Sequence, residues 1–227
     1  MAIRGGFQTR EDARHWLPSQ GVDPAPLAEL NAECLGLLVM SATDPECSHP
    51  LPPLLTTLRE PWSNLQAHAV RRLAAAPFSL FDAGFALAPR FLELRARGVH
   101  DQQRRTEPHF FEPSAARSIT RRMLVYGWHL ARSRPRAACL VFGVTGSAVD
   151  ALAACSLAVL DAAAERHAEV LRPRWAQQFG IWRELLAAAS AGADRRLHEL
   201  LLGGIQRLAA ETMAAHVADA NPHALAR

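Results

Sequence analysis

Apolar residues recur at helical spacing along most of the chain. In the segment 27–41 they return at intervals of three and four residues, which predicts an amphipathic helix. After several prolines, shorter helices are predicted over 54–59 and, with Ser63 as the N-cap, over 65–76. The apolar face of the first helix consists of Leu27, Leu30, Cys34, Leu37 and Leu38.

The first half ends in a different pattern. The run Phe-Ser-Leu-Phe over 78–81 alternates apolar and small residues and predicts a short strand. A proline then opens a predicted helix over 90–97. The stretch 98–113 is polar, bounded by proline and without periodicity, and therefore predicts a linker. The linker divides the chain into an N-terminal half, 1–97, and a C-terminal half, 114–227.

The second half is predicted to begin with a long helix that Ser114 or Ser118 caps. Its apolar stripe is formed by Ile119, Met123, Tyr126 and Leu130. The remaining predicted elements are a helix over 137–142 that Gly143 stops, helices capped by Thr145 and Ser156, a strand over 169–175, and helices over 178–189 and 195–217.

Both halves show the same predicted order: a long helix, short helical segments, a helix that leads into a strand, and a further helix. This order predicts an all-α fold of two tandem repeats that form an intrachain pseudo-dimer. The two strands are expected to pair antiparallel between the halves, with Phe81 and Trp175 in contact. A core position is favoured for Trp182 over an exposed one. The residues expected at this interface are Phe78, Leu80, Phe81, Val170, Leu171, Trp175 and Trp182.

Charge and composition narrow the function classes only slightly. Apolar residues make up 49% of the 227 residues, which is enough to bury a core without disulfides or metals. The 25 basic residues are all arginine, and 22 acids leave a formal charge of +3. A mild balance of this kind permits a local phosphate-binding patch but does not predict one.

The chain has no apolar run of signal-peptide length near its start. It also has no apolar run as long as the roughly 20 residues that a membrane-spanning helix needs. Its four cysteines lack C-x-x-C spacing, and three of them lie in apolar contexts typical of reduced thiols. These features predict a cytoplasmic protein without a membrane span.

A family resemblance begins in the second half. The residues that carry it are Ile119, Leu124 and Leu130 in the leading helix, Ala138, the turn Gly143-Val144, Leu152-Ala153, Ser156-Leu157, Ala164-Glu165, and Val170 and Arg174 in the strand. On these positions the segment 119–175 resembles the FlhD family of flagellar transcriptional regulators, with looser agreement to about residue 210. The resemblance implies a dimerising helical subunit that joins a zinc-containing partner of the FlhC family on promoter DNA.

Two functions stay open on this basis. The chain is either a FlhD-like transcriptional regulator, acting with a FlhC-like subunit on double-stranded DNA, or a helical adaptor that kept the fold and binds a protein partner without DNA contact. The recognisable core favours the first and the weak net charge favours the second. A higher oligomer is compatible with both.

Arginine pairs are the candidate phosphate ligands, because the guanidinium group donates two hydrogen bonds to one phosphate. The favoured residues are Arg195, Arg196 and Arg207 on the last helix, followed by Arg121 and Arg122. The segment 145–166 also resembles a helix-turn-helix. Its exposed face would carry Asp161, Glu165 and Glu169, and since acids repel phosphate, a packing role is favoured.

Catalytic and metal-binding patterns are weak. Cys47-Ser48-His49 with Cys34 is the nearest approach to a metal site, but no C-x-x-C or H-x-x-x-H pair supports it. No G-x-S-x-G elbow or phosphate-binding glycine loop occurs, and Gly203-Gly204 lies within a helical pattern, where it favours a kink or a close helix contact. The sequence therefore predicts no enzyme activity, no metal and no cofactor.

Overall fold

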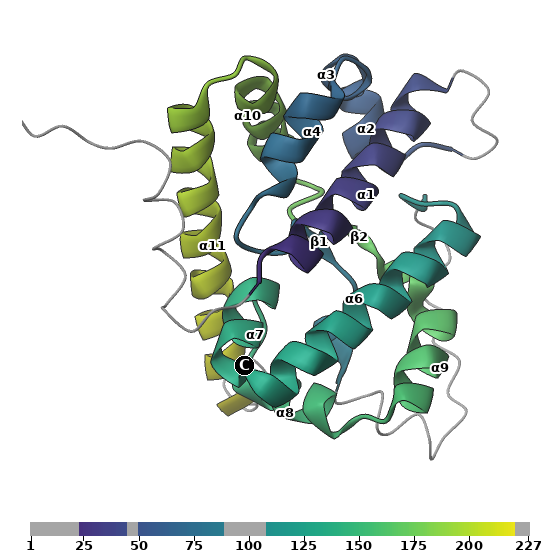
Figure 1. Ribbon diagram of the computed structural model, residues 1–227, viewed down its shortest axis with the longest axis vertical. Helices are drawn as coiled ribbons and strands as arrows, with labels where there is room; N and C mark the ends of the chain where they lie inside the picture. The colour runs from purple at the N-terminus through teal and green to yellow at the C-terminus, as the bar shows by residue number, and fades with distance from the viewer. Residues whose placement is uncertain (1–22, 45–49, 89–107, 221–227) are drawn as a thin grey trace, which may run out of the picture.

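The structure, a computed structural model, describes residues 23–44, 50–88 and 108–220 (Figure 1). Most of these residues are helical and a short two-stranded sheet joins distant parts of the chain, which confirms the all-α prediction. The predicted helix 90–97 and most of the linker 98–113 lie outside the described residues.

The first half is built around its longest helix. Its elements are α1 (Ala25–Thr43), α2 (Pro53–Thr57), α3 (Arg59–Ser63), α4 (Ala67–Ala74), β1 (Phe81–Asp82) and the 3-10 helix η2 (Phe85–Leu87). α1 packs against α3 and α4. The prediction that Ser63 caps the helix after it is wrong, because its hydroxyl donates to the Glu60 carbonyl at 3.1 Å and Ser63 ends α3.

The second half is built around α6 and ends in two further helices. Its elements are α6 (Pro113–Ser133), α7 (Pro135–Phe142), α8 (Gly146–Ala154), α9 (Leu157–His167), the 3-10 helix η4 (Ala168–Val170), β2 (Arg172–Pro173), α10 (Phe179–Ser190) and α11 (Asp194–Ala220). The caps predicted at Thr145 and Ser156 are confirmed, since their hydroxyls accept from the backbone N–H groups of Ala148 and Val159. Gly143 stops α7 with φ 58°, in the left-handed region that glycine favours.

The start of α6 differs from the prediction. Glu112 is the N-cap, and its carboxylate accepts from the backbone N–H groups of Ser114 and Ala115 at 2.9 and 3.2 Å, so the caps predicted at Ser114 or Ser118 are wrong. Phe111, assigned to the linker, is buried, and its ring packs edge-on against Phe81 with the centroids 6.0 Å apart. Phe111 therefore belongs to the core.

The predicted antiparallel strand pair is confirmed. β1 pairs with β2, with Phe81 opposite Pro173 and Asp82 opposite Arg172. β1 covers Phe81–Asp82 where 78–81 was predicted. β2 is shorter than predicted, because residues 168–170 form a 3-10 turn and Trp175 has φ 54°, which ends the extended backbone. The element order α1-α2-α3-α4-β1 matches α6-α7-α8-α9-β2, except that the 3-10 helix η4 precedes β2. This match agrees with the predicted duplication, which stays a prediction.

One hydrophobic core extends through both halves. α1 and α6 lie side by side, and α10 packs against α3 and α4 (Figure 1). Aromatic rings make the central contacts. The ring centroid of Trp182 lies 5.3 Å from that of Trp62 and 6.2 Å from that of Phe81. The centroids of Phe78 and Trp175 are 5.9 Å apart. The ring contact expected between Phe81 and Trp175 is not formed. Phe81 packs against Trp182 instead, and Trp175 packs against Phe78. The two halves are packed as one unit.

Candidate interaction surfaces

The residues predicted at the interface between the halves line the inside of the molecule. Phe78, Leu80, Phe81, Val170, Leu171 and Trp182 are buried, and Trp175 is half-buried. Trp182 has no exposed surface, so the less favoured expectation of an exposed anchor does not hold. The six buried side chains lie between the two halves of this chain, where another protein cannot reach them, whereas Trp175 stays partly accessible.

Arg174 is the polar centre of the same interface. Its backbone N–H and its Nε donate at 2.8 Å to the carbonyls of Leu80 and Ser79, and its Nη2 donates to the Phe142 carbonyl. Trp182 Nε1 in turn donates to the Arg174 carbonyl at 2.7 Å. Burial lowers the pKa of the Arg174 guanidinium, against the opposing influence of two acids. Sequence reasoning missed this role because all the acceptors are backbone carbonyls, which leave no side-chain pattern.

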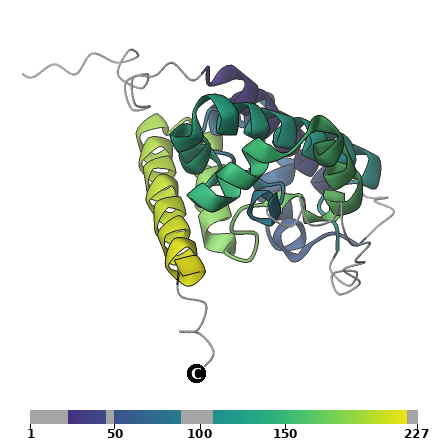
Figure 2. The same cartoon turned by 90° about the horizontal axis from the view of Figure 1, so that it is seen from below.

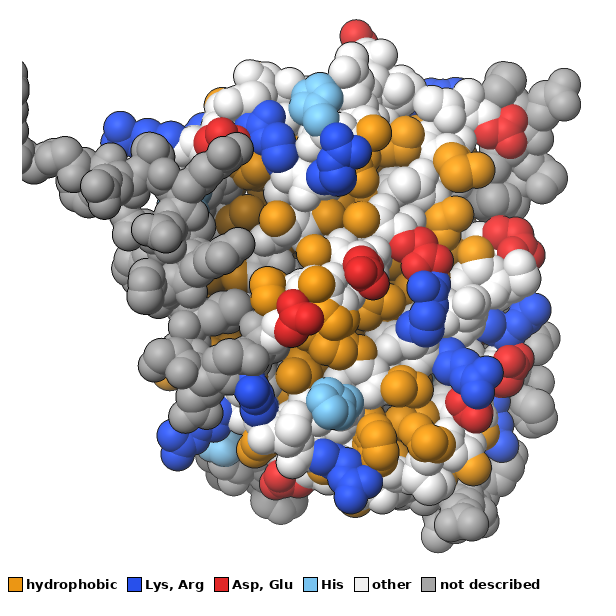
Figure 3. Space-filling model, in the orientation of Figure 1, with side chains coloured by type: hydrophobic (Ala, Val, Ile, Leu, Met, Phe, Trp, Pro, Cys, Tyr) orange, Lys and Arg blue, Asp and Glu red, His pale blue; other side chains and the backbone are white. Residues whose placement is uncertain are grey.

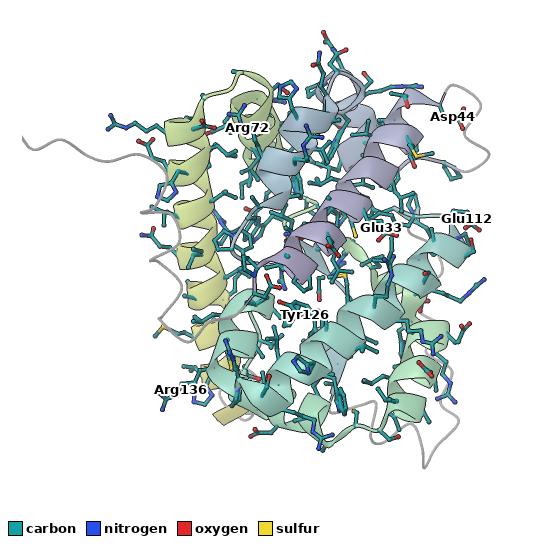
Figure 4. All side chains as sticks on the ribbon, in the orientation of Figure 1. Glu33, Asp44, Arg72, Glu112, Tyr126 and Arg136 are labelled. Carbon is teal, nitrogen blue, oxygen red and sulfur yellow. The ribbon has the colours of Figure 1, made fainter. Side chains whose placement is uncertain are left out.

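The predicted phosphate ligands on α6 are paired with acids from other helices. Arg121 contacts Asp161 of α9 at 2.7 Å. Arg122 pairs with Glu33 of α1, which Figure 4 shows at the junction of α1 and α6. These two arginines therefore join elements of the protein to one another.

The predicted ligands on α11 are also engaged. Arg195 pairs with Glu199 at 3.2 Å, Arg196 pairs with Glu184 of α10, and Arg207 donates to the side-chain amide of Gln178 at 2.9 Å. Exposed pairs contribute only about 0–1 kcal/mol each and can open. These pairs nevertheless keep the charge around each arginine near neutral. Acidic and basic side chains are interspersed on the face of the molecule that Figure 3 shows.

The helix-turn-helix-like segment is packed as expected from its acids. Its second helix, α9, lies against α6, where Asp161 pairs with Arg121 and Glu165 with Arg117 at 3.5 Å. An acidic, ion-paired face of this kind is unsuited to the DNA major groove. This geometry agrees with the packing role.

A different arginine cluster is free of acids. Arg132, Arg134 and Arg136 lie where α6 meets α7, and in the described part of the chain none of them forms an ion pair. Arg132 stacks over the Trp128 ring at 4.8 Å, and Figure 4 shows Arg136 pointing outward from α7. Their spacing was visible in the sequence, but the lack of counter-charges depends on the fold.

The second half of α11 carries exposed apolar residues. α11 lies at the edge of the molecule, with the body on one side of it (Figure 2). Leu197, Leu201 and Leu208 face the body and are buried. On the outer side Met213 is 70% exposed and Val217 is 66% exposed. The exposed apolar residues that share this outer side, here called the α11 apolar face, are Ala209, Ala210, Met213, Ala214 and Val217.

Neither a metal site nor a membrane span was found in the described residues. They contain no group of three or more His, Cys, Asp or Glu side chains placed to hold a metal ion. No single helix among them is long and apolar enough to cross a membrane, and only α7 and α8 together, bent by 115°, meet the length and composition criteria.

Comparisons with protein-family models, curated proteins and solved structures found no match for this chain.

Proposed function

We propose that this protein is a non-enzymatic helical adaptor with a FlhD-like fold, and that it binds a protein partner through the α11 apolar face. The observation that carries the proposal is the exposure of Met213 and Val217 on a long helix whose other side packs on the body. Large apolar side chains spaced four residues apart on an open helix are typical anchors for a partner helix or groove.

The state of the arginines supports binding without direct DNA contact through the predicted ligands. Arg121, Arg122, Arg195 and Arg196 each contact a carboxylate. A DNA phosphate would have to displace that carboxylate or be repelled by its negative charge. Either effect weakens the electrostatic attraction that dominates DNA affinity. The partner that the family resemblance suggests is a FlhC-like subunit.

A mobility-shift experiment tests this function. The purified chain, a FlhC-like subunit from the same genome and their mixture are each incubated with promoter DNA, while size-exclusion chromatography reports complex formation. The proposal expects the two proteins to co-elute and the chain alone to leave DNA unshifted. A shift by the chain alone would contradict it, and a shift only by the mixture would assign DNA contact to the complex.

The Arg132, Arg134 and Arg136 cluster favours a second candidate, a transcriptional regulator that touches DNA. Arg132 and Arg136 are exposed and form no ion pair in the described structure, and Arg136 lies in the first turn of α7, where backbone N–H groups also favour anions. The double variant Arg132→Gln with Arg136→Gln should then flatten the salt dependence of DNA binding, whereas Arg195→Gln should not. Absence of any salt-dependent binding by the wild type would exclude this candidate.

We also propose a cytoplasmic location. Cys34, Cys139 and Cys155 are free thiols, and two of them are buried. Burial raises the pKa of all three, which keeps them in the unreactive thiol form. Unpaired thiols in apolar surroundings are typical of a reducing compartment.

A further inference from the structure

A polar cleft lies beside β2, and Glu211 of α11 forms part of its wall. Its volume is about 300 Å³. Two guanidiniums, those of Arg172 and Arg174, and two carboxylates, those of Asp82 and Glu211, line it. The amides of Gln177 and Gln178 and the rings of Phe110 and Trp175 complete most of the wall. No part of the proposed adaptor function uses this cleft.

The charged groups of the cleft are held in place, and among the described residues they form no ion pair with one another. Asp82 accepts from the Gly84 backbone N–H at 2.9 Å, and Glu211 accepts from Trp175 Nε1 at 2.9 Å. Each bond uses one carboxylate oxygen and leaves the other available. Neither Arg172 nor Arg174 has a carboxylate within ion-pair distance among the described residues. Arg172 is exposed, so its donors are available to a ligand.

The backbone at the wall of the cleft is strained. Trp175 has φ 54°, a left-handed conformation that bulky L-residues rarely adopt. Its ring packs against Phe78, its indole N–H binds Glu211, and its carbonyl accepts from the Gln178 N–H at 2.7 Å. Strain that the surroundings maintain in this way is concentrated at binding and catalytic sites.

We propose that this cleft binds a small zwitterion, an α-amino acid or a dipeptide. Its carboxylate would bind Arg172 and the free donors of Arg174, and its ammonium group would lie toward Asp82 and Glu211. A purely anionic ligand would meet both carboxylates, and a purely cationic one would meet both guanidiniums. Only a molecule with both charges finds a counter-charge for each.

The volume agrees with this class. A cleft of about 300 Å³ has room for an amino acid or a small dipeptide. The Trp175 and Phe110 rings offer an apolar surface for a side chain, and the two glutamine amides can bind a peptide group.

The test follows the indole N–H resonance of Trp175 in the ¹⁵N-labelled full chain, assigned by its absence in Trp175→Phe. Leucine, glycine and glycyl-leucine are titrated, with N-acetylglycyl-leucine and glycyl-leucinamide as ligands that lack one charge. At least one zwitterion should shift this resonance saturably, and the blocked dipeptides should bind at least about tenfold more weakly, since each loses a charged hydrogen bond. No saturable shift with any of the three zwitterions, or equal affinity for the blocked forms, would overturn the proposal.

A matched pair of variants locates the site. Arg172→Gln should weaken zwitterion binding about tenfold, because it removes the exposed guanidinium of the cleft. Arg71→Gln, which changes an exposed arginine on α4 that does not line the cleft, should leave it unchanged. Equal affinity in the wild type and Arg172→Gln would contradict the assignment even if binding occurs.

Discussion

Asn31 shows how one polar side chain can connect a helix to the rest of the core. It is buried in α1, where its amide donates to the carbonyls of Ala74 and Phe78 at 3.3 and 3.2 Å and accepts from the Leu80 N–H at 3.0 Å. The sequence gives no sign of this role, because all three partners are backbone groups more than 40 positions away. The amide thus provides hydrogen-bond partners for backbone groups between the end of α4 and the start of β1.

Asn31→Ala should therefore lower the free energy of unfolding by about 2–4 kcal/mol, since it leaves three buried backbone groups without partners. Urea denaturation checks this value. Glu29→Ala, an exposed change on the same helix, should stay within about 0.5 kcal/mol of the wild type. A similar effect of both changes would mean that Asn31 does not have this structural role.

Glu112 gives a pH dependence at the residue scale. Hydrogen bonds from the Ser114 hydroxyl and the Ala115 backbone N–H lower the pKa of its carboxyl in the folded state. A lowered folded-state pKa adds stability above the unfolded pKa of about 4.3, and that stability is lost as the pH falls through the folded value. Glu112→Gln should thus be less stable than the wild type at pH 7, with a gap that narrows in acid. Urea titrations of both proteins across this range would contradict this if the gap stayed constant.

At the scale of elements, hydrophobic spacing predicted the helices well and their ends less well. The segments predicted over 27–41 and 195–217 became α1 and α11 with nearly the same bounds, because one face of each packs on the core. The second strand was shortened where Trp175 adopts a left-handed conformation, which no local pattern indicates. Glu112 is the N-cap of α6 where Ser114 or Ser118 was predicted, since Pro113 is a favourable first helical residue.

The adjacent glycines of α11 provide an element-scale prediction. A Cβ on Gly204 would lie 2.6 Å from Phe78 Cζ, whereas a Cβ on Gly203 would meet nothing within 4 Å. Gly203→Ala should raise the free energy of unfolding by about 0.5–1 kcal/mol through helix propensity. Gly204→Ala should lower it by about 1–3 kcal/mol through overpacking. Thermal or urea unfolding of the pair gives the signs, and equal signs would refute the close contact of α11 with Phe78.

At the scale of the whole molecule, the surfaces depended on contacts that the sequence could not reveal. The sequence shows that arginines occur in clusters, but it does not show which acids they meet. Arg122 pairs with Glu33, 89 residues away, because α6 packs on α1. The same long-range packing leaves Arg132 and Arg136 without acids. It also covers one side of α11 and leaves the other open.

Because Trp62 and Trp182 pack at the centre of a core that both halves share, the chain should unfold in one cooperative step. Tryptophan fluorescence and far-ultraviolet circular dichroism should give coincident urea transitions. Two separated transitions would instead indicate halves that fold independently.

The claim that the α11 apolar face binds a protein partner is tested most directly by calorimetric titration of a FlhC-like subunit. The titrated proteins are the wild type, the double variant Met213→Glu with Val217→Glu, and Met40→Glu, a control that changes another exposed methionine, on α1. Two buried apolar contacts are worth about 1.5–3 kcal/mol each, so the double variant should bind at least about tenfold more weakly, while the control matches the wild type. Equal affinity for all three proteins would contradict the account.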